Sequence, residues 1–177
     1  APVAVHDPMG ILAGRVPGAV PAGAGPAEAE VWVDDRTLAP PEGALVLRPA
    51  SLVAGIGCNR NTGVEEMREL LLATLQSAGL APASLARLAS VDLKADEPGL
   101  TALAGELALA VAYFSREEIR RVEADVPTPS ARVRHHIGVN SVCEAAAILA
   151  SRGGTLIVPK RSSKNATVAV ARTGSPS

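Results

Sequence analysis

The order of hydrophobic and polar positions divides the chain near residue 48. From Ser51 onward, short apolar runs alternate with longer segments whose apolar residues recur at helical spacing. The short runs predict strands at 52–56, 87–91, 110–113, 155–158 and 166–171. The longer segments predict helices at 63–78, 98–107, 116–123 and 142–152.

This alternation is typical of an α/β fold, a three-layer α/β/α sandwich with a mixed, mostly parallel sheet of about five strands. The last two strands are joined only by residues 159–165. That connection is too short for a parallel crossover, so we expect these two strands to form an antiparallel hairpin.

Three predicted helices are preceded by a hydroxyl residue with glutamate three positions later, the pattern of a capping box. The pairs are Thr62 with Glu65, Ser115 with Glu118, and Ser141 with Glu144. Glycines that close a final helical turn in the left-handed conformation are expected just after two helices, at Gly79 and Gly153.

Residues 1–47 have a different character, because proline and glycine interrupt every apolar run. The runs Val31–Val33 and Leu45–Leu47 predict one or two edge strands in an otherwise loop-rich segment. We expect two regions, this segment at 1–47 and an α/β domain at 48–177. The first residue is not methionine, so we expect a fragment or a processed chain.

Composition excludes several classes of function. The net charge of −1 and the aromatic content of 2% argue against nucleic-acid binding. No apolar run is long enough to cross a bilayer, and the start of the chain lacks a signal-peptide pattern. Two cysteines form neither a disulfide framework nor a zinc motif, which is typical of a reducing compartment and predicts a cytoplasmic protein.

The segment 52–67 combines an apolar strand, a glycine-containing loop and a helix start. This arrangement points backbone N–H groups at an anionic ligand. Ligands of open α/β sheets bind outside the carboxyl ends of parallel strands. The residues predicted at those ends are mostly basic: Arg60, Lys94, Lys160, Arg161 and Lys164, beside Asp92, Asp96 and Glu97. We therefore expect a polyanionic ligand, with solvated loop charges as the alternative.

Lys94 and Glu97 are the candidate catalytic residues, because no structural pattern explains them. Glu144 has a sufficient explanation in its expected capping box. Cys58 and Cys143 precede or begin helices, where a thiol pKa falls, but a scaffold function is the preferred interpretation of both. The neighbours His135 and His136 point apart in an extended chain, so they are interpreted as exposed loop histidines and no metal site is predicted. The alternatives are a metal site with His6 as a third ligand and a general base at one of the pair.

Four ordered blocks resemble one known family. Residues 55–62, Gly-Ile-Gly-Cys-Asn-Arg-Asn-Thr, are similar to the Gly-Ile-Gly-Cys-Arg-Arg-Gly-Thr signature of the C-terminal domain of the cobalamin-biosynthesis protein CbiG, which CobE shares. Residues 89–97 and 138–147 resemble two further blocks of the family, and Lys160 with 166–171 resembles its closing run. Asn61 replaces the usual glycine, and asparagine is the next-best residue for left-handed backbone.

The resemblance implies a function in cobalamin synthesis. CbiG opens the ring-A δ-lactone of cobalt-precorrin-5A and releases acetaldehyde, so the implied ligand is a carboxylate-rich cobalt-precorrin or related corrin intermediate. An alternative is a non-catalytic, CobE-like corrinoid-binding or carrier module. No cofactor is expected, since any cobalt belongs to the substrate. Residues 1–47 would be the remnant of a middle domain, as the lead-in 47–49 also resembles the CbiG junction.

The matched blocks also predict which positions contact the substrate. They are Gly55, Gly57, Cys58, Asn59, Arg60, Thr62, Ser141 and Lys160. A homodimer, or contact with other enzymes of the cobalamin pathway, is a further expectation, whereas nucleic acid and membrane are not expected as partners.

Overall fold

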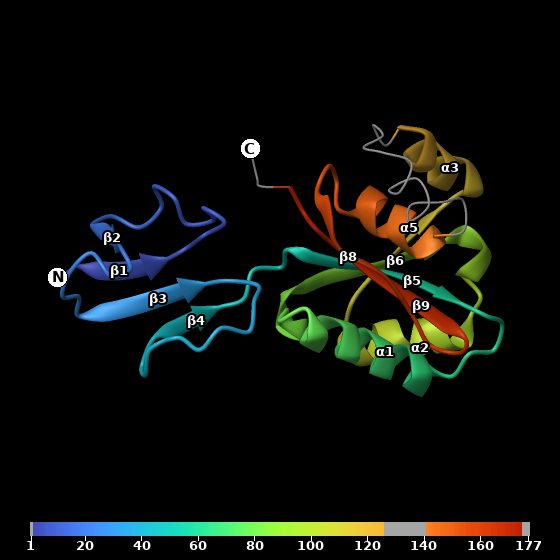
Figure 1. The fold of residues 1–177 in the computed structure, drawn as a ribbon, viewed down its shortest axis with the longest axis horizontal. Helices are drawn as coiled ribbons and strands as arrows, with labels where there is room; N and C mark the ends of the chain where they lie inside the picture. The colour runs from blue at the N-terminus through green and yellow to red at the C-terminus, as the bar shows by residue number, and fades with distance from the viewer. Residues whose placement is uncertain (1, 126–140, 175–177) are drawn as a thin grey trace.

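A computed structural model describes residues 2–125 and 141–174, which form two β-sheets (Figure 1). The first sheet contains β1 (Val3–His6), β2 (Ala19–Pro21), β3 (Ala29–Val33) and β4 (Leu45–Leu47). The second contains β5 (Leu52–Cys58), β6 (Leu85–Val91), β7 (Val111–Phe114), β8 (Thr155–Ser162) and β9 (Ala166–Arg172). The helices are α1 (Val64–Ser77), α2 (Pro98–Leu107), α3 (Arg116–Asp125) and α5 (Val142–Ala150), with short 3-10 turns η1 (Pro82–Ser84) and η2 (Asp92–Lys94).

The second sheet has the strand order β7-β6-β5-β9-β8. β5, β6 and β7 are parallel, whereas β9 runs antiparallel to both β5 and β8. The five-stranded mixed sheet and the final hairpin are therefore confirmed. β8 extends four residues beyond its predicted end at 158, to Ser162, across an irregular register with β9.

Helices cover both faces of this sheet, so the predicted three layers are confirmed (Figure 1). Alternate residues of β5 explain the arrangement: Leu52, Ala54 and Ile56 belong to the core beneath α1 and α2. Val53 points the other way, into a second core with α3 and α5. Each face of the central strand is buried, as in other sheets that are covered on both sides.

Gly55 sets the distance between the sheet and α5. A Cβ atom at this position would lie 1.8 Å from the carbonyl oxygen of Cys143 and 3.0 Å from the amide nitrogen of Ala147. Only glycine permits this approach, which brings the start of α5 directly over β5.

One of the three predicted capping boxes is present. The Ser115 hydroxyl accepts the Glu118 amide, and the Glu118 carboxylate accepts the Ser115 amide. The other two predictions are wrong, since neither α1 nor α5 has a side-chain cap. Other partners explain the difference: the Thr62 hydroxyl donates to the carbonyls of Asn59 and Asn165, and the Glu144 carboxylate accepts the amide of Lys160. The left-handed conformations expected at Gly79, Gly153 and Asn61 are confirmed by φ angles of 65°, 82° and 59°.

The N-terminal segment is more regular than predicted. Instead of one or two edge strands, residues 3–47 form a four-stranded parallel sheet in the order β2-β1-β3-β4. The described residues 2–47 contain no helix, and the connections are turns rich in glycine. Strands of three to five residues are too short to give a periodic signal, which explains the error. The origin of this segment in a middle domain stays a prediction.

Two buried aspartates follow β3, and the second of them, Asp35, joins the two sheets. Asp35 accepts two hydrogen bonds from the Arg172 guanidinium, at 2.6 and 2.8 Å, and one from the Ser51 hydroxyl. Burial alone would raise the pKa of Asp34, but hydrogen bonds from Arg36 and His6 outweigh it and lower that pKa to about 2.

None of the helices in the described residues has both the length and the apolar composition of a membrane-spanning segment.

Candidate functional site

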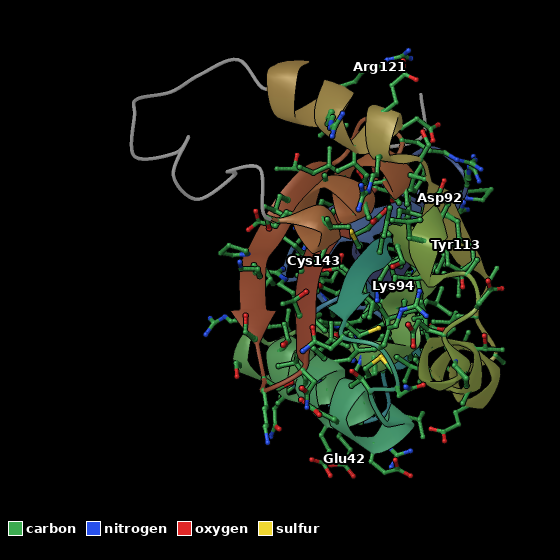
Figure 2. All side chains as sticks on the ribbon, turned by 90° about the vertical axis from the view of Figure 1, so that its right-hand side faces the viewer. Glu42, Asp92, Lys94, Tyr113, Arg121 and Cys143 are labelled. Carbon is green, nitrogen blue, oxygen red and sulfur yellow. The ribbon has the colours of Figure 1, made fainter. Side chains whose placement is uncertain are left out.

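The topology brings the carboxyl ends of β5, β6, β7 and β8 to one edge of the sheet, which faces the viewer in Figure 2. A cleft of about 370 Å³ lies at this edge. Gly57, Cys58 and Asn59 line it from β5 and the following loop, and Lys94 lines it from η2. The signature segment and the first catalytic candidate are thus neighbours in space, as the sequence predicts.

The loop after β5 is held by hydrogen bonds to the turn between β8 and β9. The Asn59 amide donates to the carbonyl of Asn165, and the Thr62 hydroxyl donates to the carbonyl of Asn59 at 2.8 Å. Glu66 on α1 accepts the amide and the side-chain NH₂ of Asn165 and the hydroxyl of Ser163. These bonds lower the pKa of Glu66. Most polar groups of this loop are therefore engaged by the protein itself.

Glu97 is part of the same framework. Its side chain is buried, with one carboxylate oxygen accepting the amide of Asn61 at 3.1 Å. The other oxygen lies 3.5 Å from the Lys94 ammonium. Glu97 thus has a structural partner that its position in the sequence does not indicate, because Asn61 lies 36 residues earlier. The pair leaves Lys94 part-exposed at the cleft, with Glu97 behind it.

Neither cysteine is in an activating environment. Burial raises the pKa of Cys58, although nearby Lys94 opposes the effect. Burial likewise raises the pKa of Cys143, and the Ser141 hydroxyl lies 4.0 Å from its sulfur. Both thiols therefore stay protonated near neutral pH, in agreement with the scaffold interpretation.

Glu144 does not cap α5. Its carboxylate is 1% exposed, and one oxygen accepts the backbone amide of Lys160 at the irregular part of β8. The other oxygen has no hydrogen-bond partner among the described residues. The capping explanation of Glu144 is therefore wrong, and the residue instead joins α5 to β8.

The predicted contact residues divide into three groups. Gly57, Cys58 and Asn59 line the cleft. Gly55, Thr62 and Ser141 are buried and do not line it. Arg60 and Lys160 are exposed and do not line it.

A second cleft, of about 340 Å³, adjoins the first and was not predicted. The two share Val91, Lys94 and Val142 as lining residues. Arg116 and Arg120 of α3 also line the second cleft. The sequence could have indicated these two arginines as site residues. They follow the end of β7 and are spaced four residues apart, which places them on one face of a helix. We call the two clefts together the groove.

The described residues contain no cluster of three side chains suited to a metal ion. His6 lies in the N-terminal sheet, where it contacts Asp34 and stacks on Trp32. His135 and His136 lie outside the described residues. The absence of a cofactor stays a prediction.

The chain matches the family described as "Cobalamin synthesis G C-terminus" over residues 52–171. It is 37% identical over 123 residues to protein CobE of Sinorhizobium sp, and this match covers 69% of the chain and 80% of CobE. It is 33% identical over 130 residues to cobalt-precorrin-5A hydrolase of Priestia megaterium, covering 73% of this chain but 34% of that enzyme. The chain thus spans about a third of the length of this hydrolase.

A crystal structure of CobE, described as a protein from the cobalamin (vitamin B12) biosynthetic pathway, has the same fold. It superposes with a TM-score of 0.59 at 38% identity, covering 72% of this chain and 93% of CobE. The chain therefore belongs to the family of the cobalamin synthesis G C-terminus, and its function lies in cobalamin biosynthesis.

Proposed function

We propose that the groove binds a carboxylate-rich corrin intermediate and that the domain is the substrate-binding part of a cobalt-precorrin-5A hydrolase. The observation that carries this proposal is the position of Lys94, which lines both clefts of the groove. Lys164 in the first cleft and two arginines in the second add positive charge. A ligand with acidic groups around its rim matches this distribution of charge.

Lys94 is also the residue best placed to assist the chemistry. Opening a lactone by water develops negative charge on the carbonyl oxygen, and a fixed cation stabilises that charge. The backbone amides of residues 57–60 are alternative donors to such an oxyanion, but the Asn59 amide is already bonded to Asn165. In our proposal Lys94 therefore takes this function, and Glu97 positions it through the 3.5 Å contact.

The test is to incubate the chain with cobalt-precorrin-5A while following binding and acetaldehyde release separately. We expect Lys94→Met to lower kcat/KM by about 10²-fold, the effect of losing one donor to an oxyanion. Arg60→Ala is the matched control, because it removes an exposed cation that lies outside the groove. Equal turnover by Lys94→Met and the unaltered chain would contradict the assignment.

A second candidate is a CobE-like carrier that binds the corrinoid without transforming it. It is favoured by the lining of the groove, which includes no carboxylate among the described residues that could serve as a general base. The same experiment separates the candidates. Binding without acetaldehyde favours the carrier, whereas turnover that depends on Lys94 favours the hydrolase.

A further inference from the structure

We propose that Arg116 and Arg120 form a second carboxylate-binding subsite, so that one macrocyclic ligand extends along the whole groove from Lys164 to α3. This inference rests on the proposed function, because it assumes that the ligand is a corrin intermediate. Beyond the proposed function, it specifies how the ligand lies in the groove. It also assigns two binding residues that lie outside the four blocks resembling the family.

The two clefts are continuous. Val91 and Val142 line both, so a ligand that lies on them contacts the first and second cleft at once. Ile119 and Leu93 extend this apolar surface into the second cleft. A large, mostly apolar ring is the kind of group that buries such a surface.

Cations stand at both ends of the apolar surface. Lys164 lines the first cleft, Arg116 and Arg120 line the second, and Lys94 lies where the two join. A ring with acidic substituents on opposite sides could pair with both ends, whereas a small dicarboxylate would need only one. Arginine is the favoured partner because its planar donors bind carboxylates in pairs.

The acidic residues next to these two arginines on α3 have other partners, so the arginines can pair with a ligand. Glu117 pairs with Arg121, and Glu118 accepts the Ser115 amide. Within the described residues, Arg116 and Arg120 form no ion pair or side-chain hydrogen bond. Arg121 does not line the groove, and Figure 2 shows it on α3 well away from Lys94.

Uroporphyrin and coproporphyrin are suitable probes of the full chain. Uroporphyrin carries an acetate and a propionate on each pyrrole ring, whereas methyl groups replace the acetates of coproporphyrin. We expect the double variant Arg116→Ala/Arg120→Ala to weaken uroporphyrin binding by about tenfold or more, as for the loss of charge-assisted hydrogen bonds. The loss should be smaller for coproporphyrin, and the salt dependence of uroporphyrin binding should become weaker.

Arg121→Ala is the matched control, since it removes the same charge from the same helix outside the groove. It should change the dissociation constant by less than about twofold, the size expected for an exposed charge. An equal loss in Arg121→Ala and in the double variant would overturn the subsite, because the effect would then be one of net charge. Circular dichroism would establish that both variants keep α3.

Two results distinguish failure of the subsite from failure of the proposed function. If Lys94→Met and Lys164→Ala weaken uroporphyrin binding but the double arginine variant does not, the subsite is wrong and the groove is still the binding site. If the unaltered chain binds neither porphyrin nor cobalt-precorrin-5A, the proposed function fails and the subsite fails with it.

Discussion

The two walls of the groove differ in how they use their polar groups. One wall, which we call the signature wall, comprises residues 55–62 and the turn 163–166, and its side chains and amides bond mainly to each other. The other, the cation wall, comprises Lys94, Arg116 and Arg120, of which only Lys94 has a described ion pair. The signature wall therefore builds the shape of the site, whereas the cation wall, together with Lys164 of the turn, supplies its positive charge.

The largest expected effect on stability comes from a substitution that disrupts the packing of the signature wall against α5. In Gly55→Ala the new Cβ would lie 1.8 Å from the Cys143 carbonyl oxygen, so α5 must move away from β5. We expect the free energy of unfolding to fall by about 3 kcal/mol or more, at the upper end for overpacked cores. Urea unfolding followed by circular dichroism measures this change.

Gly105→Ala provides the matched control for that variant. Gly105 lies inside α2, and a Cβ there has no neighbour within 4 Å. Alanine should stabilise the helix by up to about 1 kcal/mol. Similar destabilisation by the two substitutions would mean that Gly55 does not set the distance between β5 and α5.

A smaller effect is expected where the two walls meet, at Glu97. Glu97→Ala leaves the Asn61 amide without its acceptor and Lys94 without its partner. We expect a loss of about 0.5–1.5 kcal/mol in the free energy of unfolding, the net contribution of one hydrogen bond, because Asn61 itself is exposed. Glu97→Gln keeps an acceptor for Asn61 and should recover most of that stability.

The turnover of Glu97→Gln tests whether Glu97 positions Lys94 or takes part in the reaction itself. If Glu97 only positions Lys94, then Glu97→Gln should lower turnover less than Lys94→Met. A Glu97→Gln variant that is fully stable but as inactive as Lys94→Met would instead place Glu97 in the chemistry itself.

The fold of the second sheet could be predicted because its strands and helices are long enough to show their periods. β5 alternates between two buried faces, and α1 spans 14 residues. The first sheet could not, since strands such as β2 and β4 have three residues each. Its stability comes from pairing between distant segments and from the junction at Asp35, which leave no local pattern.

The candidate site was predictable in part for a similar reason. The rule that strand ends share an edge placed Cys58 beside Lys94 correctly. Local patterns failed where a tertiary partner competed, as for Glu144, which bonds to Lys160 instead of Ser141. Arg116 and Arg120 were missed because helix register and burial decide which surface arginines line a groove.

Lowering the pH should destabilise the signature wall more than the cation wall. Hydrogen bonds from Ser163 and Asn165 hold the pKa of Glu66 below its ordinary value of 4.5. The stability that they contribute is therefore present above about pH 4.5 and is lost as the pH falls through the lower, folded-state pKa. Glu66→Gln should destabilise the protein at neutral pH, and its difference from the unaltered chain should shrink in acid.

Urea unfolding at pH 7 and at about pH 3 measures this difference. Glu65→Gln is the control, because Glu65 is an exposed neighbour on the same helix that accepts no hydrogen bond among the described residues. A pH-independent effect of Glu66→Gln would show that the charge of Glu66 does not hold the turn 163–166.

The smallest effect is expected at Cys58, the thiol of the signature wall. Burial raises its pKa from the ordinary value of 9.0, and the opposing influence of Lys94 does not reverse this. Alkylation at pH 7 should therefore be slower than that of free cysteine, and Cys58→Ser should change uroporphyrin binding by less than about twofold. Rapid alkylation at pH 7 would mean that the start of α1 stabilises a thiolate, and Cys58 would then belong with the reactive groups of the cation wall rather than with the scaffold.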